Sequence, residues 1–332
     1  MQGCILNNLN NTHNNSNSHL ADAGKYLGAS NNGKKIWAIG GGKGGVGKSL
    51  VTSNLSICLA LMGMKVIAID MDLGGANLHT CLGVSVPSKT LSDYFTKPNT
   101  KLSDLITPTP LENLSLISGA QDNLGMANLK AAHKSKVLND LRELDADYIL
   151  LDLGAGTTNN TLDFFLGADE GILVTLPEPT SIENTYRFIK SIYHRKLQSV
   201  DDFLELGPLI DKVMNGKVGE NRKPSEIIEK AMQINEQQGL KLKREIESIT
   251  PKLIINQART QADIDIGFAM RIISKKYFGI NLDYVGFLEY DATVWQSVKK
   301  KKPLILEFPN SSLVKNFEHV INRILNLTKK MV

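Results

Sequence analysis

A glycine-rich segment carries the clearest chemistry in this chain: residues 40–49 are Gly-Gly-Gly-Lys-Gly-Gly-Val-Gly-Lys-Ser. Glycines let successive backbone N–H groups converge on a phosphate, and the N-terminus of a following helix adds partial positive charge. Lys48 can reach the β- and γ-phosphates of a nucleotide, and the Ser49 hydroxyl can ligate Mg²⁺. The segment therefore predicts a site for ATP and Mg²⁺, because an ordinary glycine turn would not require the Lys-Ser ending. The predicted nucleotide-binding residues here are Gly42, Lys43, Gly44, Gly45, Val46, Gly47, Lys48, Ser49 and Leu50.

Two apolar runs end in carboxylates that could serve the same site. Asp70 and Asp72 follow the run 66–69, and Asp152 ends a second run. Carboxylates just past the C-terminal ends of parallel strands lie beside a phosphate site at that edge, and the alternation of an extended chain points Asp70 and Asp72 the same way. Asp152 would be desolvated unless Mg²⁺ or bound water satisfies it. We expect Asp152 to hold the metal through water and Asp70 to support the magnesium shell. For Asp72, a turn or helix-cap role is the alternative.

The elements that must position these residues alternate along the chain. Strands are expected at residues 36–39, 65–70, 114–117, 148–152, 171–175, 253–256 and 284–288, and helices at 49–62, 134–144 and 182–193. This alternation predicts an α/β, three-layer P-loop NTPase fold, with a mostly parallel twisted sheet flanked by helices. Residues of about 194–250 lack strand signals and predict an inserted helical segment at the sheet edge, serving either packing or a partner. Residues 1–33 predict a disordered Asn-rich tail, and residues 34–332 a single domain.

Composition narrows the class of protein. The chain has 332 residues, 42 % of them hydrophobic and 22 % charged, with a net charge of +4 that is too small to imply nucleic acid by itself. Cys4, Cys58 and Cys81 form no Cys-x-x-Cys pair, which disfavours a zinc or iron–sulfur site; Cys58 and Cys81 are expected to be buried fillers. Neither a signal peptide nor an apolar run of membrane-spanning length is evident. We therefore expect a cytoplasmic protein, with polar or membrane-peripheral placement as the alternative.

Lys43 is a second lysine that an ordinary phosphate loop does not need. With this lysine the segment resembles the deviant Walker A motif of the MinD/ParA ATPases, and the resemblance runs from about residue 35 to the end of the chain. It implies an Mg²⁺-dependent ATP hydrolase with slow basal turnover and a homodimer in the ATP state. In that dimer Lys43 would contact the phosphates of the other subunit, so hydrolysis would depend on dimerisation, as with an arginine finger. A solvated surface lysine is the alternative.

The same resemblance implies roles for residues around the loop. Asp72 would position the attacking water, Asn77 would lie across the dimer interface, and Gly154 would bring its N–H to the γ-phosphate. Asn256 would recognise adenine through an amide that donates and accepts at once; a strand-end cap is the alternative. Family members often have proline in the short segment after Asp152, and Gly154-Ala155-Gly156 lacks it, which predicts a looser segment. The expected catalytic residues are Lys43, Lys48 and Asp72, and the expected metal-binding residues are Ser49, Asp72 and Asp152.

Residues 289–305, which include the run Lys299 to Lys302, are similar to the flagellar-number regulator branch, FlhG (also called FleN). This implies an ATP-dependent switch that regulates the placement or number of a cell-pole structure, with the flagellar GTPase or switch components as protein partners. The alternatives are a ParA-type segregation ATPase that binds DNA, a MinD-like division-site regulator, a protein that holds ATP without hydrolysing it, and an Mrp-type iron–sulfur carrier. The lysine run is either a solvated face or a contact with anionic lipid, nucleic acid or a partner.

Both ends of the chain depart from that branch. Residues 313–325 carry a helical apolar stripe and are expected to form the last core helix, which leaves 328–332 and no separate anchor helix. Membrane binding would require the final helical turn both to complete the core helix and to contact lipid. Near the N-terminus, residues 21–27 only loosely resemble the peptide with which FlhG proteins stimulate the flagellar GTPase, because the Gln and Arg are missing.

Overall fold

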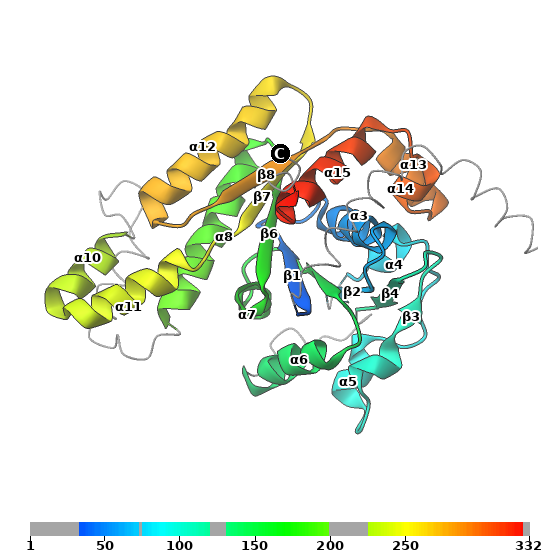
Figure 1. The fold of residues 1–332 in the computed structure, drawn as a ribbon, viewed down its shortest axis with the longest axis horizontal. Helices are drawn as coiled ribbons and strands as arrows, with labels where there is room; N and C mark the ends of the chain where they lie inside the picture. The colour runs from blue at the N-terminus through cyan, green and yellow to red at the C-terminus, as the bar shows by residue number, and fades with distance from the viewer. Residues whose placement is uncertain (1–32, 73–74, 120–130, 199–224, 328–332) are drawn as a thin grey trace, which may run out of the picture.

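The computed structural model describes residues 33–72, 75–119, 131–198 and 225–327 (Figure 1). The Asn-rich tail, the segment 21–27, the central residues 199–224 of the expected insertion and the end 328–332 lie outside these ranges. The expectations stated for them stay predictions.

An eight-stranded sheet forms the centre of the molecule, in the order β3-β4-β2-β5-β1-β6-β7-β8. Neighbouring strands are parallel except for β3 and β4, which pair in the antiparallel sense. The strands are β1 (Lys35–Gly40), β2 (Val66–Met71), β3 (Thr107–Pro108), β4 (Leu114–Ile117), β5 (Tyr148–Leu153), β6 (Glu170–Thr175), β7 (Lys252–Ala258) and β8 (Asp283–Glu289). The seven predicted strands and the mostly parallel sheet are confirmed; the two-residue β3 was not predicted because so short an edge strand leaves no periodic signal.

Helices cover both faces of the sheet (Figure 1). They are α3 (Lys48–Leu61), α4 (Leu78–Cys81), α5 (Leu91–Thr96), α6 (Ala131–Glu143), α7 (Asn159–Gly167), α8 (Pro179–Gln198), α10 (Ser225–Ile234), α11 (Glu236–Glu247), α12 (Gln261–Phe278), α13 (Thr293–Lys300), α14 (Leu304–Glu307) and α15 (Ser312–Ile324), with a 3-10 turn at Leu102–Leu105. None of the helices within the described ranges is both long and apolar enough to cross a membrane.

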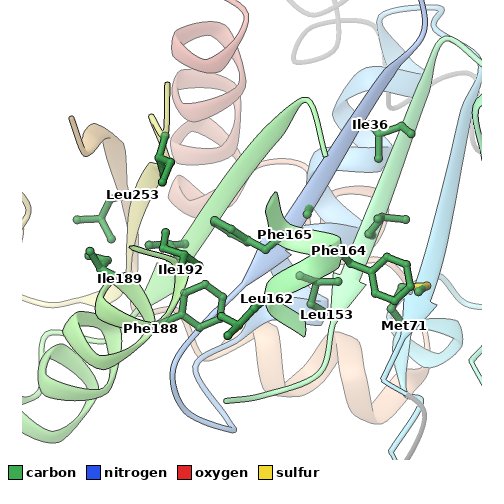
Figure 2. Packing of buried hydrophobic residues seen from close by; sticks show 14 of the residues in the cluster. Ile36, Met71, Leu153, Leu162, Phe164, Phe165, Phe188, Ile189, Ile192 and Leu253 are labelled. Atoms are coloured by element: carbon green, nitrogen blue, oxygen red, sulfur yellow. The ribbon is translucent and has the colours of Figure 1, made fainter. Parts of the chain in front are cut away.

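The core consists of two apolar clusters, one on each face of the sheet, and β1 contributes side chains to both. Ile36 and Ala38 face a cluster shared with α6, α7, α8 and α12, whereas Trp37 and Ile39 face a cluster shared with α3 and α15. This is the two-residue alternation of a strand that is buried on both faces. In the first cluster the ring of Phe165 meets that of Phe188 edge-on at 5.1 Å (Figure 2).

The described part of the expected insertion is helical, as predicted, but it does not extend the edge of the sheet. Helices α10 and α11 pack against each other, and α11 packs against α8. Their buried residues Ile227, Leu242 and Ile246 join the same apolar cluster as α8 and α12. Lys196 on α8 and Glu245 on α11 form an ion pair at 2.7 Å. Strand β8, reached only later in the chain, is the outer strand on the β7 side of the sheet. The expected position of the insertion at the sheet edge stays a prediction.

Candidate nucleotide-binding site

The phosphate loop joins the central strand β1 to the N-terminus of α3. The loop residues Gly45 and Gly47 have φ values of 77° and 94°, a conformation that residues with a Cβ rarely adopt. A Cβ on Gly47 would also stand 2.3 Å from Nδ2 of Asn256. Helix α3 starts at Lys48, and no side chain caps it. The first turn therefore presents backbone N–H groups and the positive end of the helix dipole to an anion.

The other predicted residues of the phosphate loop differ in their surroundings. A Cβ on Gly42 would stand 2.0 Å from the carbonyl oxygen of Asn184, so the loop passes directly against α8. Gly44 is exposed, Val46 is buried, and Ser49 and Leu50 are half-buried in the first turn of α3. The backbone at Gly44 and Gly45 is therefore exposed to solvent, whereas the buried side chain of Val46 anchors the loop just before α3 begins.

Four charged groups, those of Lys48, Asp70, Asp72 and Asp152, lie near one another beneath the loop. Asp152 at the end of β5 is buried and accepts hydrogen bonds from the hydroxyls of Ser49 and of Thr52, the latter at 3.2 Å. Burial, with a smaller contribution from the nearby Asp70, raises the pKa of Asp152 to about 7. Burial lowers the pKa of Lys48, although Asp152 and Asp72 oppose this.

This donor set fits magnesium. Mg²⁺ prefers hydroxyl and carboxylate oxygens and is usually held by one or two carboxylates together with substrate phosphates. Ser49 and Asp152 supply such oxygens, and the raised pKa of Asp152 indicates a buried charge that a cation would stabilise. Among the described residues no group of three or more His, Cys, Asp and Glu side chains is placed to hold a metal by itself.

Asp70 binds the backbone of the turn that follows β2, and its expected support of the magnesium shell stays a prediction. Its two carboxylate oxygens accept hydrogen bonds from the backbone N–H groups of Asp72 and Leu78, each at 3.0 Å. Burial raises the pKa of Asp70 to about 6. Asp70 therefore shapes the turn between β2 and α4, and that turn carries Asp72.

Asp72 and the segment after β5 lie together. A Cβ on Gly154 would lie in ordinary van der Waals contact with the Asp72 carboxylate, at 3.7 Å, so the two segments are neighbours. The N–H of Gly156 donates to the Gly41 carbonyl at 3.2 Å, and Gly156 has a φ of 86°. A proline at 156 could neither donate this bond nor adopt this φ. The segment without proline is thus tied directly to the phosphate loop.

Lys43 and Asn77, the two residues expected at a dimer interface, make exposed contacts within the single chain. The Nζ of Lys43 lies 3.3 Å from the Thr180 hydroxyl and 3.8 Å from a Glu178 carboxylate oxygen, and its side chain is 42 % exposed. Asn77 is exposed and donates from Nδ2 to the Gly75 carbonyl at 2.7 Å. Both side chains remain accessible to a second molecule.

Asn256 is buried at the end of β7, where it locks the phosphate loop. Its Nδ2 donates to the Val46 carbonyl at 2.8 Å, and its Oδ1 accepts from the N–H of Gln257 at 2.9 Å. Beside it, the guanidinium of Arg259 stacks on the Tyr290 ring at 3.9 Å. Asn256 thus connects the end of β7 to the loop.

Three residues of the site were not predicted from the sequence. Thr52 binds Asp152, and Glu178 and Thr180 hold Lys43. Thr52 stands one helical turn after Lys48, so the i, i+4 spacing could have revealed it. Glu178 and Thr180 have no such signal, because only the fold brings the start of α8 to the loop.

A phosphate loop between the central strand and an uncapped helix places the chain among the P-loop NTPases. The family model described as "ParA: NUBPL iron-transfer P-loop NTPase" matches residues 32–200. The chain belongs to the MinD/ParA family of P-loop NTPases.

Several curated proteins are similar in sequence. The antiactivator FleN of Pseudomonas aeruginosa is 26 % identical over 293 residues, covering 87 % of this chain and 86 % of FleN. The septum site-determining protein MinD of Helicobacter pylori is 36 % identical over 157 residues, covering 46 % of this chain and 57 % of MinD. The flagellum site-determining protein YlxH of Helicobacter pylori is 35 % identical over 161 residues, covering 47 % of this chain and 53 % of YlxH. The last two matches thus span little more than half of the relatives' length.

Solved structures share the fold. The septum site-determining protein MinD complexed with Mg-ADP from Pyrococcus horikoshii has a TM-score of 0.60 at 24 % identity, covering 90 % of this chain and 99 % of that one. MinD from Pyrococcus furiosus has a TM-score of 0.57 at 22 % identity, covering 88 % and 99 %. Identities this low show the fold alone.

Proposed function

We propose that this protein is an Mg²⁺-dependent ATPase switch that dimerises in the ATP state and regulates the placement or number of a polar structure, most specifically the flagellum. The observation that carries the proposal is the cluster of Lys48, Ser49 and buried Asp152 beneath an uncapped helix start, with accessible Lys43 on the same loop. The similarity to FleN over most of both chains supports the flagellar role.

Each residue of the site has a part in this activity. The loop backbone and Lys48 bind the phosphates, Ser49 and Asp152 hold Mg²⁺, and Asp72 orients the attacking water. When bound, the metal neutralises charge on the transferring phosphoryl group. Asn256, next to the loop, recognises the adenine amino group or ring nitrogens, and the Gly154 N–H approaches the γ-phosphate.

Lys43 makes the activity depend on a second subunit. To reach the phosphates of a partner it must leave Glu178 and Thr180, which hold it only through exposed contacts. Such contacts contribute about 0–1 kcal/mol, so the exchange costs little. Asn77 would meet the same interface. Protein partners, such as the flagellar GTPase or switch components, would then bind one nucleotide state in preference to the other, at a polar or membrane-peripheral position reached from the cytoplasm.

The test is size-exclusion chromatography with light scattering on Asp72→Ala, which should bind ATP but not hydrolyse it. We expect a dimer with Mg-ATP and a monomer without it, and a monomer in both conditions for Asp72→Ala with Lys43→Ala. The matched control is Lys35→Ala, because Lys35 stands at the end of β1 opposite the loop. This variant should leave the dimer unchanged. A monomer under all conditions would refute the switch and favour a solitary nucleotide-binding regulator.

Segregation of DNA is the alternative function. The four-lysine run of residues 299–302 favours it, but Lys300 and Lys302 both pair with Glu307, at 2.8 and 3.0 Å. Fluorescence anisotropy with a labelled DNA duplex separates the two functions. ATP-dependent binding that weakens steeply with salt would support segregation; no binding at low salt would exclude it.

A further inference from the structure

Helix α12 exposes large apolar side chains. Phe268 is 50 % exposed and Ile272 is 65 % exposed, one helical turn apart, and Tyr277 is also exposed. The helix contacts the sheet only through a narrow stripe, in which Gly267 lies against the Tyr284 ring. Single exposed apolar residues are ordinary on a protein surface, but several on one helix mark an interaction surface.

Phe268 and Ile272 line a hollow that we call the α12 groove. It has a volume of about 840 Å³ and includes apolar walls from Phe268, Ile272 and Leu282 and cations from Arg271, Lys275 and Lys276. The Phe268 ring is held edge-on against Tyr284, with ring centres 4.9 Å apart. One wall is therefore fixed before anything binds, which lowers the entropy cost of binding. The volume fits several side chains of a peptide and exceeds what one side chain could fill.

The charge of the α12 groove is one-sided. Arg271, Lys275 and Lys276 form no ion pair with any residue within the described ranges, whereas the acid at the rim, Asp283, lies 3.6 Å from Nζ of Lys252. A complementary occupant must bring carboxylates as well as apolar groups.

The α12 groove lies far from the nucleotide site. Helix α12 starts after Thr260, next to the loop-binding end of β7, and its groove residues 268–276 lie about 10 to 22 Å further along the helix axis. Of the other groove residues, Thr250 precedes β7, and residues 281–283 lead into the start of β8, at the ends of these strands opposite Asn256. Lys43 and Asn77 are therefore not covered by anything bound in the groove.

We propose that the α12 groove binds an amphipathic helical segment of a partner protein, with acidic residues beside its apolar positions. Phe268 and Ile272 are one turn apart and match apolar side chains one turn apart on such a helix. Arg271, Lys275 and Lys276 contact its carboxylates. Because the groove is distant from the loop, this segment binds with or without nucleotide, and the proposal stands even if the ATP-dependent dimer fails its own test.

The test measures fluorescence anisotropy of the full chain with a fluorescein-labelled helical peptide built from Leu and Glu. We expect saturable binding that Ile272→Glu weakens at least tenfold and that Mg-ATP leaves unchanged. The double variant Lys275→Glu with Lys276→Glu should bind the Glu peptide more weakly. It should bind the same peptide with Lys in place of Glu more tightly. Val86→Glu is the matched control, because Val86 is 62 % exposed on a different part of the surface and should have no effect.

Other occupants give different results. Failure of the Glu peptide to bind, or equal loss in Val86→Glu, overturns the proposal. Binding only after Asp201→Asn, Asp202→Asn and Glu205→Gln overturns it in favour of the acidic segment of this chain, which lies outside the described residues. Absence of peptide binding together with Ile272-dependent sedimentation on phosphatidylglycerol vesicles overturns it in favour of an anionic membrane.

Discussion

Asp70 and Asp152 occupy directly paired positions on the neighbouring parallel strands β2 and β5, and both are buried. The two acids have different partners. Asp70 binds the backbone of the turn that carries Asp72, and Asp152 binds the hydroxyls at the start of α3. Two buried acids side by side each favour the protonated form of the other. A cation at Asp152 would therefore relieve both.

This pair predicts a pH dependence of stability. Burial raises the pKa of Asp152 to about 7 and that of Asp70 to about 6, above their values in an unfolded chain. A raised folded pKa means that the folded state holds the proton more tightly, so the destabilisation is full above the folded pKa and is relieved as the pH falls through it. Without nucleotide, lowering the pH from about 8 to about 5.5 should raise the contribution of these groups to stability, by on the order of 1–2 kcal/mol.

Urea unfolding at the two pH values checks this, with Asp152→Asn as the comparison. The variant should lose most of the pH dependence. Equal pH dependence in both proteins would show that other groups cause it. Affinity for Mg-ATP should fall over the same range, because protons compete with the metal for Asp152.

Gly47→Ala should abolish nucleotide binding and destabilise the fold. The added methyl group must adopt a φ of 94° and lies 2.3 Å from Asn256, so the loop and β7 must separate. Gly63→Ala is the matched control: its φ is 84°, but nothing lies within 4 Å of the added Cβ. The control should cost only the left-handed strain, about 1–2 kcal/mol, and keep nucleotide binding. Thermal unfolding and binding of a fluorescent ATP analogue measure both effects, and identical behaviour of the two variants would contradict the close approach.

Asn256→Ala should weaken nucleotide binding through two separable effects. Loss of the 2.8 Å hydrogen bond leaves the buried Val46 carbonyl unpaired, which costs about 1–3 kcal/mol of loop stability and affects any nucleotide. Loss of adenine recognition affects ATP alone. Calorimetry with Mg-ATP and Mg-GTP should show a larger loss for ATP. Equal losses would limit Asn256 to holding the loop.

Glu178→Gln should favour the ATP-state dimer. It removes the carboxylate that holds Lys43 at 3.8 Å in the single chain, and exposed pairs of this kind contribute about 0–1 kcal/mol. In the Asp72→Ala background the dimer dissociation constant should fall by up to about fivefold. Glu183→Gln, which removes an exposed i, i+4 pair with Arg187, is the control and should leave the constant unchanged. Weaker dimerisation in Glu178→Gln would mean that Glu178 serves the dimer rather than opposing it.

Sequence patterns were sufficient for the architecture and for much of the site. Alternating apolar runs predicted the seven longer strands, and the phosphate loop was predictable because glycines, a lysine and a hydroxyl at fixed spacing form a local structure. Asp152 was predictable for the same reason, since a carboxylate that ends an apolar strand is a local signal.

The tertiary structure decided which distant residues meet. Asn256 contacts Val46 across 210 positions of the chain, Lys43 meets the start of α8, and the α12 groove joins one helix to residues that precede two strands. It also turned Asp70 toward the backbone of the next turn. Local spacing determines the conformation of a few consecutive residues, but these contacts depend on strand order and helix packing, which the whole chain determines.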